Sequence, residues 1–230
     1  MKIHFSIDDV IGCFLWLTRN DCDSIFESYV FKCAKDLYEM YGIHTTCNCM
    51  YSDGINNLSE VSGRFKTQFQ ENNEWLKFSF HCYGPDSNYK HANEKVVAED
   101  FQKVIGELER ITGGGKSISN IVRLHFFQGS AEVVEYLREQ GIEILLTADD
   151  ERGSYDLCLQ EEKELSERGL FRRNEMTYIR TDFRVEREQS IQRYDKETLV
   201  LFTHECFMGD VKIRDRLCEI MEVQGNYKNL

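Results

Sequence analysis

The chain has 230 residues, of which 41% are hydrophobic and 12% aromatic, so it has enough apolar side chains to fold around a sizeable core. Its formal net charge of -12 at pH 7 argues against nucleic acid as a main partner, because phosphate binding requires clustered Lys and Arg. No stretch approaches the ~20 consecutive apolar residues that a membrane-spanning helix needs.

Short apolar strands alternate with amphipathic helices along most of the chain. A strand is predicted over 2–8, where Ile3, Phe5 and Ile7 alternate with polar residues. A helix over 23–42 follows, and Gly42 is expected to end it. Further strands are predicted over 43–51, 76–84, 120–127, 142–148 and 198–205, and further helices over 93–112, 130–141 and 212–224, with Asn93 and Ser130 as N-caps.

The pattern loosens after Asp150, where we expect irregular structure and a polar β-hairpin. In the segment TDFRVE of this hairpin, the charged residues Asp182, Arg184 and Glu186 could form a substrate wall or an ion-pair ladder, and the ladder is the favoured prediction. Strands that alternate with helices predict an α/β fold with a parallel sheet, either doubly wound or closed into a barrel.

Polar residues gather where the predicted strands end, which is where parallel α/β folds bind their ligands. The strand ends deliver Asp8 and Asp9, then His81 with His91 ten residues later, then Arg123 and His125, then Asp149 and Asp150, and finally His204 and Glu205. Carboxylates and imidazoles are what a metal-dependent hydrolase needs as metal ligands, as the base for a water and as the acid for a leaving group. Each residue taken singly is also compatible with a structural or solvated role.

Four of these segments resemble motifs of the polysaccharide deacetylases, the NodB-homology or carbohydrate esterase family 4 group. FSIDDV is similar to the Thr-Phe-Asp-Asp-Gly motif at the end of the family's first strand, and FSFHCYG lies where the histidine-rich second motif is expected. VRLHFF is similar to Arg-x-Pro-Tyr, and LVLFTHE is similar to Leu-x-Leu-His. The resemblance implies an irregular (β/α) barrel of about six to seven parallel strands, with residues 1–230 as a single domain and a polar hairpin insertion around 165–196.

The resemblance also implies a role for each matching residue. Asp8 would be the general base, Arg123 would brace it, and His204 would be the general acid. The metal, expected to be Zn²⁺, would be held by Asp9, His81 and His91.

The chain departs from the family pattern at several positions. The second motif normally carries two histidines four residues apart, but position 85 is proline and the next histidine is His91. Val10 replaces the glycine after the two aspartates, and His125 and Phe126 replace Pro-Tyr. A divergent enzyme fits these departures, and so does a pseudoenzyme that kept the barrel.

The leading hypothesis is a metal-dependent hydrolase that removes an acetyl group from an N-acetylated sugar or sugar conjugate, possibly in surface-polysaccharide biosynthesis. The segment MKIHFSIDDV lacks the long apolar run of a secretory signal, and the nine cysteines are scattered as buried free thiols are, so a cytoplasmic location is predicted. One alternative is an inactive barrel that binds carbohydrate or acts as a scaffold. A two-carboxylate glycosidase that uses Asp149 and Asp150 is disfavoured, because adjacent acids lie too close and point apart.

Overall fold

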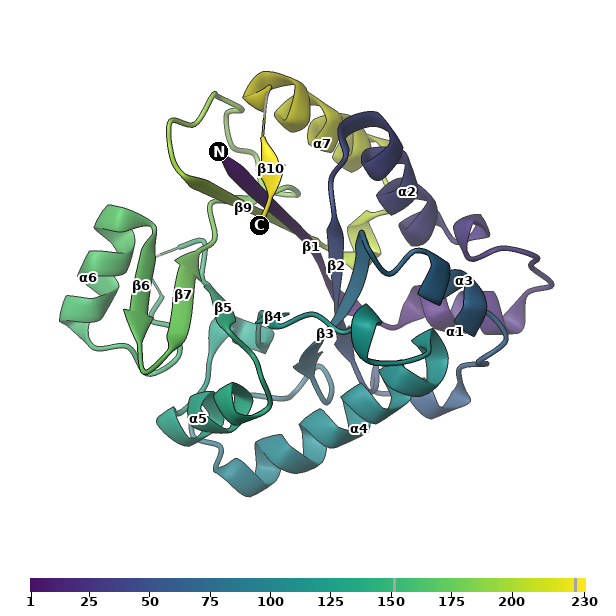
Figure 1. Ribbon diagram of the computed structural model, residues 1–230, viewed down its shortest axis with the longest axis horizontal. Coiled ribbons are helices and arrows are strands. Elements are labelled where there is room, and N and C mark those ends of the chain that lie inside the picture. The colour runs from purple at the N-terminus through teal and green to yellow at the C-terminus, as the bar shows by residue number, and fades with distance from the viewer. Residues whose placement is uncertain (151, 226) are drawn as a thin grey trace.

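The computed structural model describes residues 1–150, 152–225 and 227–230 (Figure 1). The strands in this part of the chain are β1 (Lys2–Val10), β2 (Thr45–Met50), β3 (Leu76–Cys82), β4 (Ile121–Val122), β5 (Ile144–Thr147), β6 (Leu170–Arg173), β7 (Met176–Arg180), β8 (Phe183–Arg184), β9 (Thr198–His204) and β10 (Lys228–Asn229). The α-helices are α1 (Gly12–Arg19), α2 (Tyr29–Tyr41), α3 (Lys66–Glu71), α4 (Glu94–Thr112), α5 (Ala131–Glu139), α6 (Leu159–Arg168) and α7 (Val211–Gln224). Within the described ranges, no helix is long and apolar enough to span a membrane.

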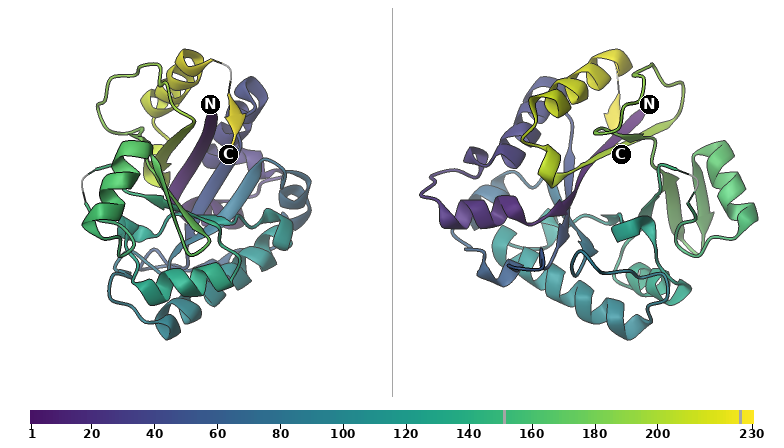
Figure 2. Two further views of the ribbon diagram at one scale, coloured as in Figure 1. Left: turned by 60° about the vertical axis from the view of Figure 1, so that its left-hand side comes forward. Right: turned by 180° about the vertical axis from the view of Figure 1, so that it is seen from behind.

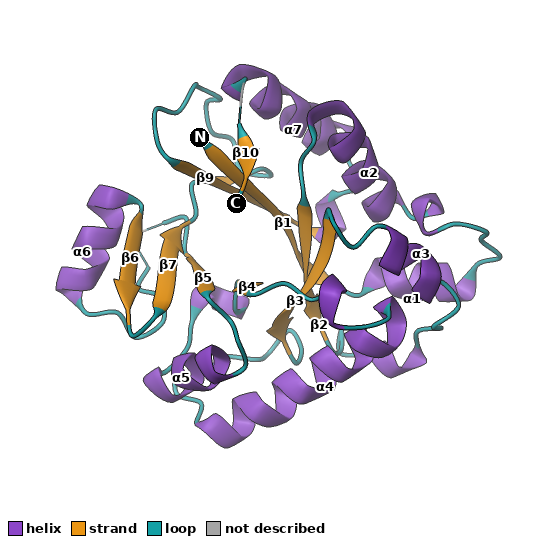
Figure 3. Cartoon of the chain, viewed as in Figure 1, coloured by secondary structure: helices purple, strands orange, loops and turns teal. Residues whose placement is uncertain are grey.

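The strands form two mainly parallel sheets. The first has the order β3-β2-β1-β9-β8, with β10 paired to the start of β1, and the second has the order β4-β5-β7-β6. Among the described strands, only the pairing of β6 with β7 is antiparallel. An isolated parallel bridge between Phe78 of β3 and Ile118 brings the segment before β4 to the edge of the first sheet, but the strands do not close into a continuous ring. The predicted α/β class is confirmed, as an irregular and open barrel with its helices on the outside (Figure 3).

Strand β1 lies in the middle of the first sheet and is covered on both faces. Ile3, Phe5 and Ile7 belong to the main apolar core. The alternating side chains Ser6 and Asp8 point the other way, toward the centre of the barrel, where a buried arginine of the second sheet contacts both. The register between β1 and β9 places Asp8 opposite His204, so two of the predicted functional residues are neighbours on adjacent strands.

The core between the first sheet and its helices is rich in aromatic rings. Phe14 of α1, Phe31 of α2, Phe69 of α3 and Phe78 of β3 pack with ring centroids 5.3–6.2 Å apart. Burial of each ring contributes roughly 1.5–3 kcal/mol. Helices α2 and α7 lie side by side over this sheet, and α4 packs against β3 and α5 (Figures 1 and 2). The core therefore anchors the strands whose ends carry the polar residues.

Three predicted helix ends are confirmed, whereas the helix predicted over 23–42 begins only at Tyr29, after a separate 3-10 turn over Ile25–Glu27. The Asn93 side chain accepts the Val96 N–H at the start of α4, and the Ser130 side chain accepts the Val133 N–H at the start of α5. Gly42, with φ +68°, ends α2.

Three helices lie outside the predicted elements. Helix α1 buries Cys13, Phe14, Leu15 and Leu17, so its apolar residues run together without a clear helical period. Helix α3 has only six residues. Helix α6, in the segment expected to be irregular, buries Leu165 alone, so it too lacks an apolar stripe.

The strand predicted over 120–127 is shorter than expected. Only Ile121–Val122 pair as β4, and side chains of β3 contact carbonyl groups along this segment: Ser79 Oγ donates to the Ile121 carbonyl at 2.8 Å, and His81 Nδ1 lies 2.5 Å from the Arg123 carbonyl. The chain then turns sharply, with Phe126 and Phe127 at φ +57° and +60°.

The hairpin predicted around 165–196 corresponds to β6 and β7. Its second strand, β7, pairs in parallel with β5, so the hairpin is part of the second sheet.

Candidate metal-binding and catalytic site

Asp8 is held inside the barrel by a buried network. It is 2% exposed, and Arg123, which is 0% exposed, lies with Nη1 3.1 Å from Asp8 Oδ1. Asn48 Nδ2 donates to the same oxygen at 2.6 Å, and Arg123 Nη1 also donates to Ser6 Oγ at 2.5 Å. The guanidinium packs over the Phe202 ring, 4.2 Å from its centroid. Asp8 is therefore fixed in one orientation beside a permanent cation.

We expect replacement of Arg123 by methionine to destabilise the protein by about 3–5 kcal/mol, because it leaves the Asp8 carboxylate buried without its cation. Urea denaturation of the two proteins measures the difference. The double variant Asp8→Asn, Arg123→Met is expected to recover much of the loss, because it removes both charges. A loss below about 1 kcal/mol for the single variant would mean that the pair behaves like a solvated one.

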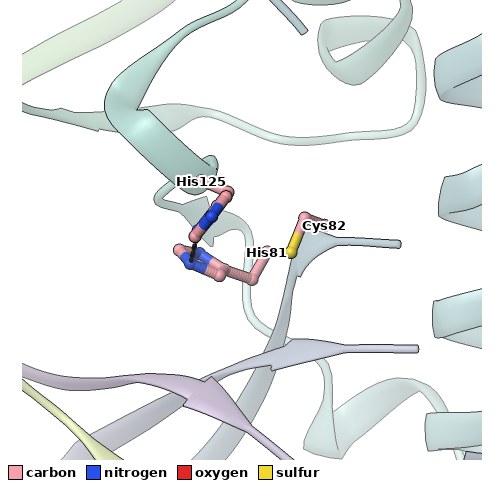
Figure 4. A group of neighbouring side chains, drawn as sticks. All are labelled: His81, Cys82 and His125. Carbon is pink, nitrogen blue, oxygen red and sulfur yellow. Dashed lines mark hydrogen bonds between the residues drawn. The ribbon is translucent and has the colours of Figure 1, made fainter. Parts of the chain in front are cut away.

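Asp9 points away from Asp8 and toward two histidines. It has φ +61°, a left-handed conformation that is uncommon for residues other than glycine. Asp9 Oδ1 lies 3.2 Å from His81 Nε2 and 3.6 Å from His125 Nδ1. The two ring nitrogens are 3.3 Å apart, and Figure 4 shows the rings turned toward one another. Side chains from β1, β3 and the turn after β4 thus form a triangle of three ligand-type atoms, here called the Asp9–His81–His125 triangle.

The other nitrogen of each ring contacts a backbone carbonyl. His81 Nδ1 lies 2.5 Å from the Arg123 carbonyl oxygen, and His125 Nε2 lies 3.1 Å from the Pro85 carbonyl oxygen. A carbonyl can only accept, so each of these nitrogens carries the proton, and in the neutral rings His81 Nε2 and His125 Nδ1 carry lone pairs. Asp9 Oδ1 is buried and has no hydrogen-bond partner among the described residues. Three electron-pair donors therefore face one another, an arrangement that a cation between them would stabilise.

The electrostatic environment favours a cation at this point. Burial raises the pKa of Asp9, but its contact with His81 and the charges of His81, His204 and His125 outweigh burial and lower the pKa to about 2. Burial and the neighbouring His81 lower the pKa of His125, so this ring is neutral at pH 7, as a metal ligand must be. Burial also lowers the pKa of His81, but Asp9 and the charge of Asp8 outweigh it and raise the pKa. The same negative potential attracts a divalent cation.

The separations within the triangle fit one metal ion. Nitrogen and oxygen ligands at ~2.0–2.1 Å from a tetrahedral ion lie about 3.3–3.4 Å apart, and the three separations here are 3.2, 3.3 and 3.6 Å. The Cys82 thiol is a further neighbour, since ligand atoms of His81, Cys82 and His125 all lie within 4.8 Å of one another (Figure 4). Burial, followed by the charge of Asp9, raises the pKa of Cys82, so this thiol is protonated while no metal binds it.

The structure does not bring His91 to the triangle. His91 is exposed on the loop between β3 and α4. In this loop the buried ring of Tyr89 points inward and its hydroxyl donates to Asp100 at 2.9 Å, while the Pro85 carbonyl contacts His125. The sequence interpretation missed His125 as a ligand, although its position two residues after Arg123, at the end of a strand, was the available signal.

His204 is paired with a carboxylate that the sequence interpretation placed in a ladder. His204 Nδ1 lies 2.5 Å from Glu186 Oε1, two residues after β8. Burial lowers the pKa of His204, but Glu186 and the charge of Asp8 outweigh it and raise the pKa. The predicted ladder is wrong: Asp182 pairs with Lys196, and Arg184 pairs with Asp149.

Asp149 and Asp150 are both occupied by arginines. Asp149 Oδ1 lies 2.8 Å from Arg184 Nη2 and Oδ2 lies 2.8 Å from Arg187 Nη1, while Asp150 Oδ2 lies 2.7 Å from Arg152 Nη2. Neither carboxylate is placed as the free acid or base that a glycosidase would need.

Comparison with known proteins identifies the fold. No protein-family model matches the chain, and no curated protein matches its sequence. Among solved structures, a putative polysaccharide deacetylase from Mycobacterium smegmatis matches 99% of this chain and 86% of its own, with a TM-score of 0.55 and 12% identity. A family 4 acetyl xylan esterase from Clostridium thermocellum, solved with a cobalt ion, matches 100% of this chain and 87% of its own, with a TM-score of 0.51 and 8% identity.

A CE4 family pseudoenzyme from Bacillus anthracis also matches 100% of this chain and 63% of its own, with a TM-score of 0.50 and 11% identity. Likenesses at such low identity identify a fold and leave activity open. The chain has the fold of the polysaccharide deacetylases of carbohydrate esterase family 4, as a divergent example of it.

Proposed function

We propose that the protein is a metal-dependent hydrolase that removes an acetyl group from an N-acetylated sugar or small sugar conjugate. The observation that carries the proposal is the Asp9–His81–His125 triangle, in which each histidine donates one N–H to a backbone carbonyl and turns its other nitrogen toward the same point. The buried Asp8 and the Glu186-bound His204 support it, because they supply a candidate base and a candidate acid near that point. We take residues 1–230 as a single catalytic domain, and we place the reaction in the cytoplasm, as a step of surface-polysaccharide biosynthesis.

The proposed ligands are Asp9, His81 and, in place of the predicted His91, His125. Two imidazoles and one carboxylate are a ligand set that suits Zn²⁺ and leaves a fourth position open. When bound, such an ion supplies Lewis-acid activation of a water molecule and of the amide carbonyl. The His81 and His125 rings are oriented for this role by the Arg123 and Pro85 carbonyls.

Asp8 and His204 would handle the protons. Asp8, held by Arg123 and Asn48, would accept a proton from the attacking water. His204 would donate a proton to the departing amine, which is a poor leaving group without it. Glu186 raises the pKa of His204 and so favours the protonated form that an acid needs.

The ligand set is tested by comparing two histidines. His125→Ala is expected to lose bound Zn²⁺, because it removes one corner of the triangle. His91→Ala is the matched control, since His91 is exposed and should leave the metal content unchanged. Metal content after reconstitution is measured by elemental analysis. Loss of metal from His91→Ala with retention in His125→Ala would restore the ligand set predicted from the sequence.

The role of Glu186 gives a pH prediction. His204 must be protonated to act as an acid, and Glu186 raises its pKa, so Glu186→Gln should move the alkaline limb of the kcat–pH profile to lower pH. The control is Glu188→Gln, because Glu188 is exposed on the same segment. An unmoved alkaline limb in Glu186→Gln would remove His204 as the group that sets it.

The alternative is an inactive barrel that binds carbohydrate or acts as a scaffold. It is favoured by two observations: a protein of this fold is a pseudoenzyme, and Val10, His125 and Phe126 depart from the family motifs. Metal uptake separates the two proposals. A chain that takes up no Zn²⁺ on reconstitution would support the scaffold.

A further inference from the structure

Glu205 is a buried carboxylate that the proposed chemistry does not use. It follows β9 directly, next to His204, and it is 6% exposed. Its carboxylate does not contact the His204 ring; it accepts hydrogen bonds from the backbone N–H groups of Ile11 at 3.0 Å, Gly12 at 2.8 Å and Cys13 at 2.5 Å. Those amides begin α1, and the N-cap residue Ile11 has no side chain that could cap the helix. Glu205 therefore caps α1 from a distance of more than 190 residues along the chain.

The segment that Glu205 holds is the one that aims Asp9. Asp9, two residues before Ile11, is in a left-handed conformation, and the pairing of β1 with β2 is irregular between Ile7 and Val10. A non-glycine residue stays in such a conformation only where its surroundings hold it there. Val10 pairs with Cys49 of β2, and the Glu205 hydrogen bonds begin at the very next residue, so the two together are well placed to maintain the direction of the Asp9 carboxylate.

Gly12 permits the close approach of the carboxylate. A Cβ at this position would lie 3.2 Å from Glu205 Oε2, closer than most such contacts, although the backbone of Gly12 is outside the left-handed region. An alanine here would therefore have to displace the carboxylate by a few tenths of an ångström, while the backbone conformation itself would accept it.

We propose that Glu205 is a positioning residue that fixes the metal ligand Asp9 relative to the acid His204. One carboxylate ties the end of β9, which carries His204, to residues 11–13, which directly follow the end of β1 that carries Asp9. The inference rests on the proposed function, since it takes Asp9 as a ligand and His204 as the acid. The role is indirect: Glu205 acts through the backbone of residues 11–13, and no hydrogen bond between it and the metal triangle is found in the described part of the chain.

The test is a titration with Co²⁺, in which binding is monitored through the visible absorption of the bound ion. The absorption band also reports the geometry of the ligands around the ion. Glu205→Gln is expected to bind Co²⁺ about 10–100-fold more weakly and to alter the absorption band, as loss of groups that orient ligands typically does. Asp210→Asn is the matched control, because Asp210 caps α7 by accepting the Lys212 N–H at 2.9 Å, and among the described residues no hydrogen bond joins its side chain to residues 11–13. It should lose similar stability and keep the wild-type affinity and spectrum.

A second variant covers the case in which Glu205→Gln fails to fold. Gly12→Ala keeps the carboxylate and favours the helix, but its Cβ pushes Glu205 away from the turn. It should fold and still bind Co²⁺ more weakly than wild type.

The outcomes separate this inference from the proposed function. Wild-type protein that binds no Co²⁺ overturns both. Wild-type binding together with unchanged affinity and spectrum in Glu205→Gln, or in Gly12→Ala if Glu205→Gln does not fold, overturns the role of Glu205 and leaves the proposed function standing.

Discussion

Replacement of Asp9 by glycine is expected to abolish metal binding while the fold stays intact. The variant removes Oδ1, the one carboxylate oxygen of the triangle, and leaves only His81 and His125. Glycine is the replacement of choice because it adopts φ +61° without strain, whereas alanine there would add a backbone penalty of about 1 kcal/mol or more. Elemental analysis after Zn²⁺ reconstitution measures the loss, and urea denaturation measures the fold.

The matched control for this variant is Asn174→Gly. Asn174 is also a non-glycine residue at positive φ, +50°, but it is exposed in the turn between β6 and β7. It should relieve a similar backbone strain and leave the metal content unchanged. If Asp9→Gly retained full metal content with a native fold, Asp9 would be removed from the ligand set and the triangle would lose its functional meaning.

The backbone conformation of β1 directs the Asp8 and Asp9 side chains to different neighbours, which is why their proposed roles differ. Successive residues of a strand point to opposite faces, so Asp8 faces Arg123 inside the barrel, where a cation is already present. Asp9 leaves the strand through a left-handed turn and faces two histidines instead. The two carboxylates are neighbours in sequence but sit in separate electrostatic environments, which removes much of the repulsion expected of an adjacent pair.

The alternation of apolar and polar residues in the strands is the sequence pattern that predicted the fold and much of the site. The alternation in β1, β3 and β9 placed Asp8, Asp9, His81 and His204 at strand ends, and the structure places them at one end of the first sheet. Such predictions succeed because strand ends in a parallel sheet meet at one edge whatever the details of the loops.

Strand periodicity alone did not identify two residues as members of the site, because non-periodic backbone positions them. His125 reaches the triangle through a turn in which Phe126 and Phe127 have positive φ, a conformation that no apolar pattern encodes. Glu186 lies just beyond strand β8, which has two residues and is therefore too short to show an alternating pattern. No pattern in the sequence predicts that Glu186 pairs with His204. Helix α6 was missed for the related reason that it buries a single leucine.

His204→Ala is expected to slow hydrolysis of an N-acetylated sugar by about 10²–10⁴-fold, the usual contribution of a positioned general acid. An amide releases an amine, which must be protonated as it leaves, whereas an activated acetate ester releases a stable anion. The variant should therefore cleave the ester with a much smaller loss.

Metal content should stay at the wild-type level in His204→Ala, because no contact of His204 with the triangle is found in the described part of the chain. The matched control is His44→Ala, since His44 precedes β2, at the opposite end of the strands, and should leave both reactions unchanged. Steady-state rates on both substrates measure the difference. Equal losses on amide and ester would mean that His204 has a structural role, and since Glu186 acts only through this ring, the acid would have to be sought among other groups at the strand ends.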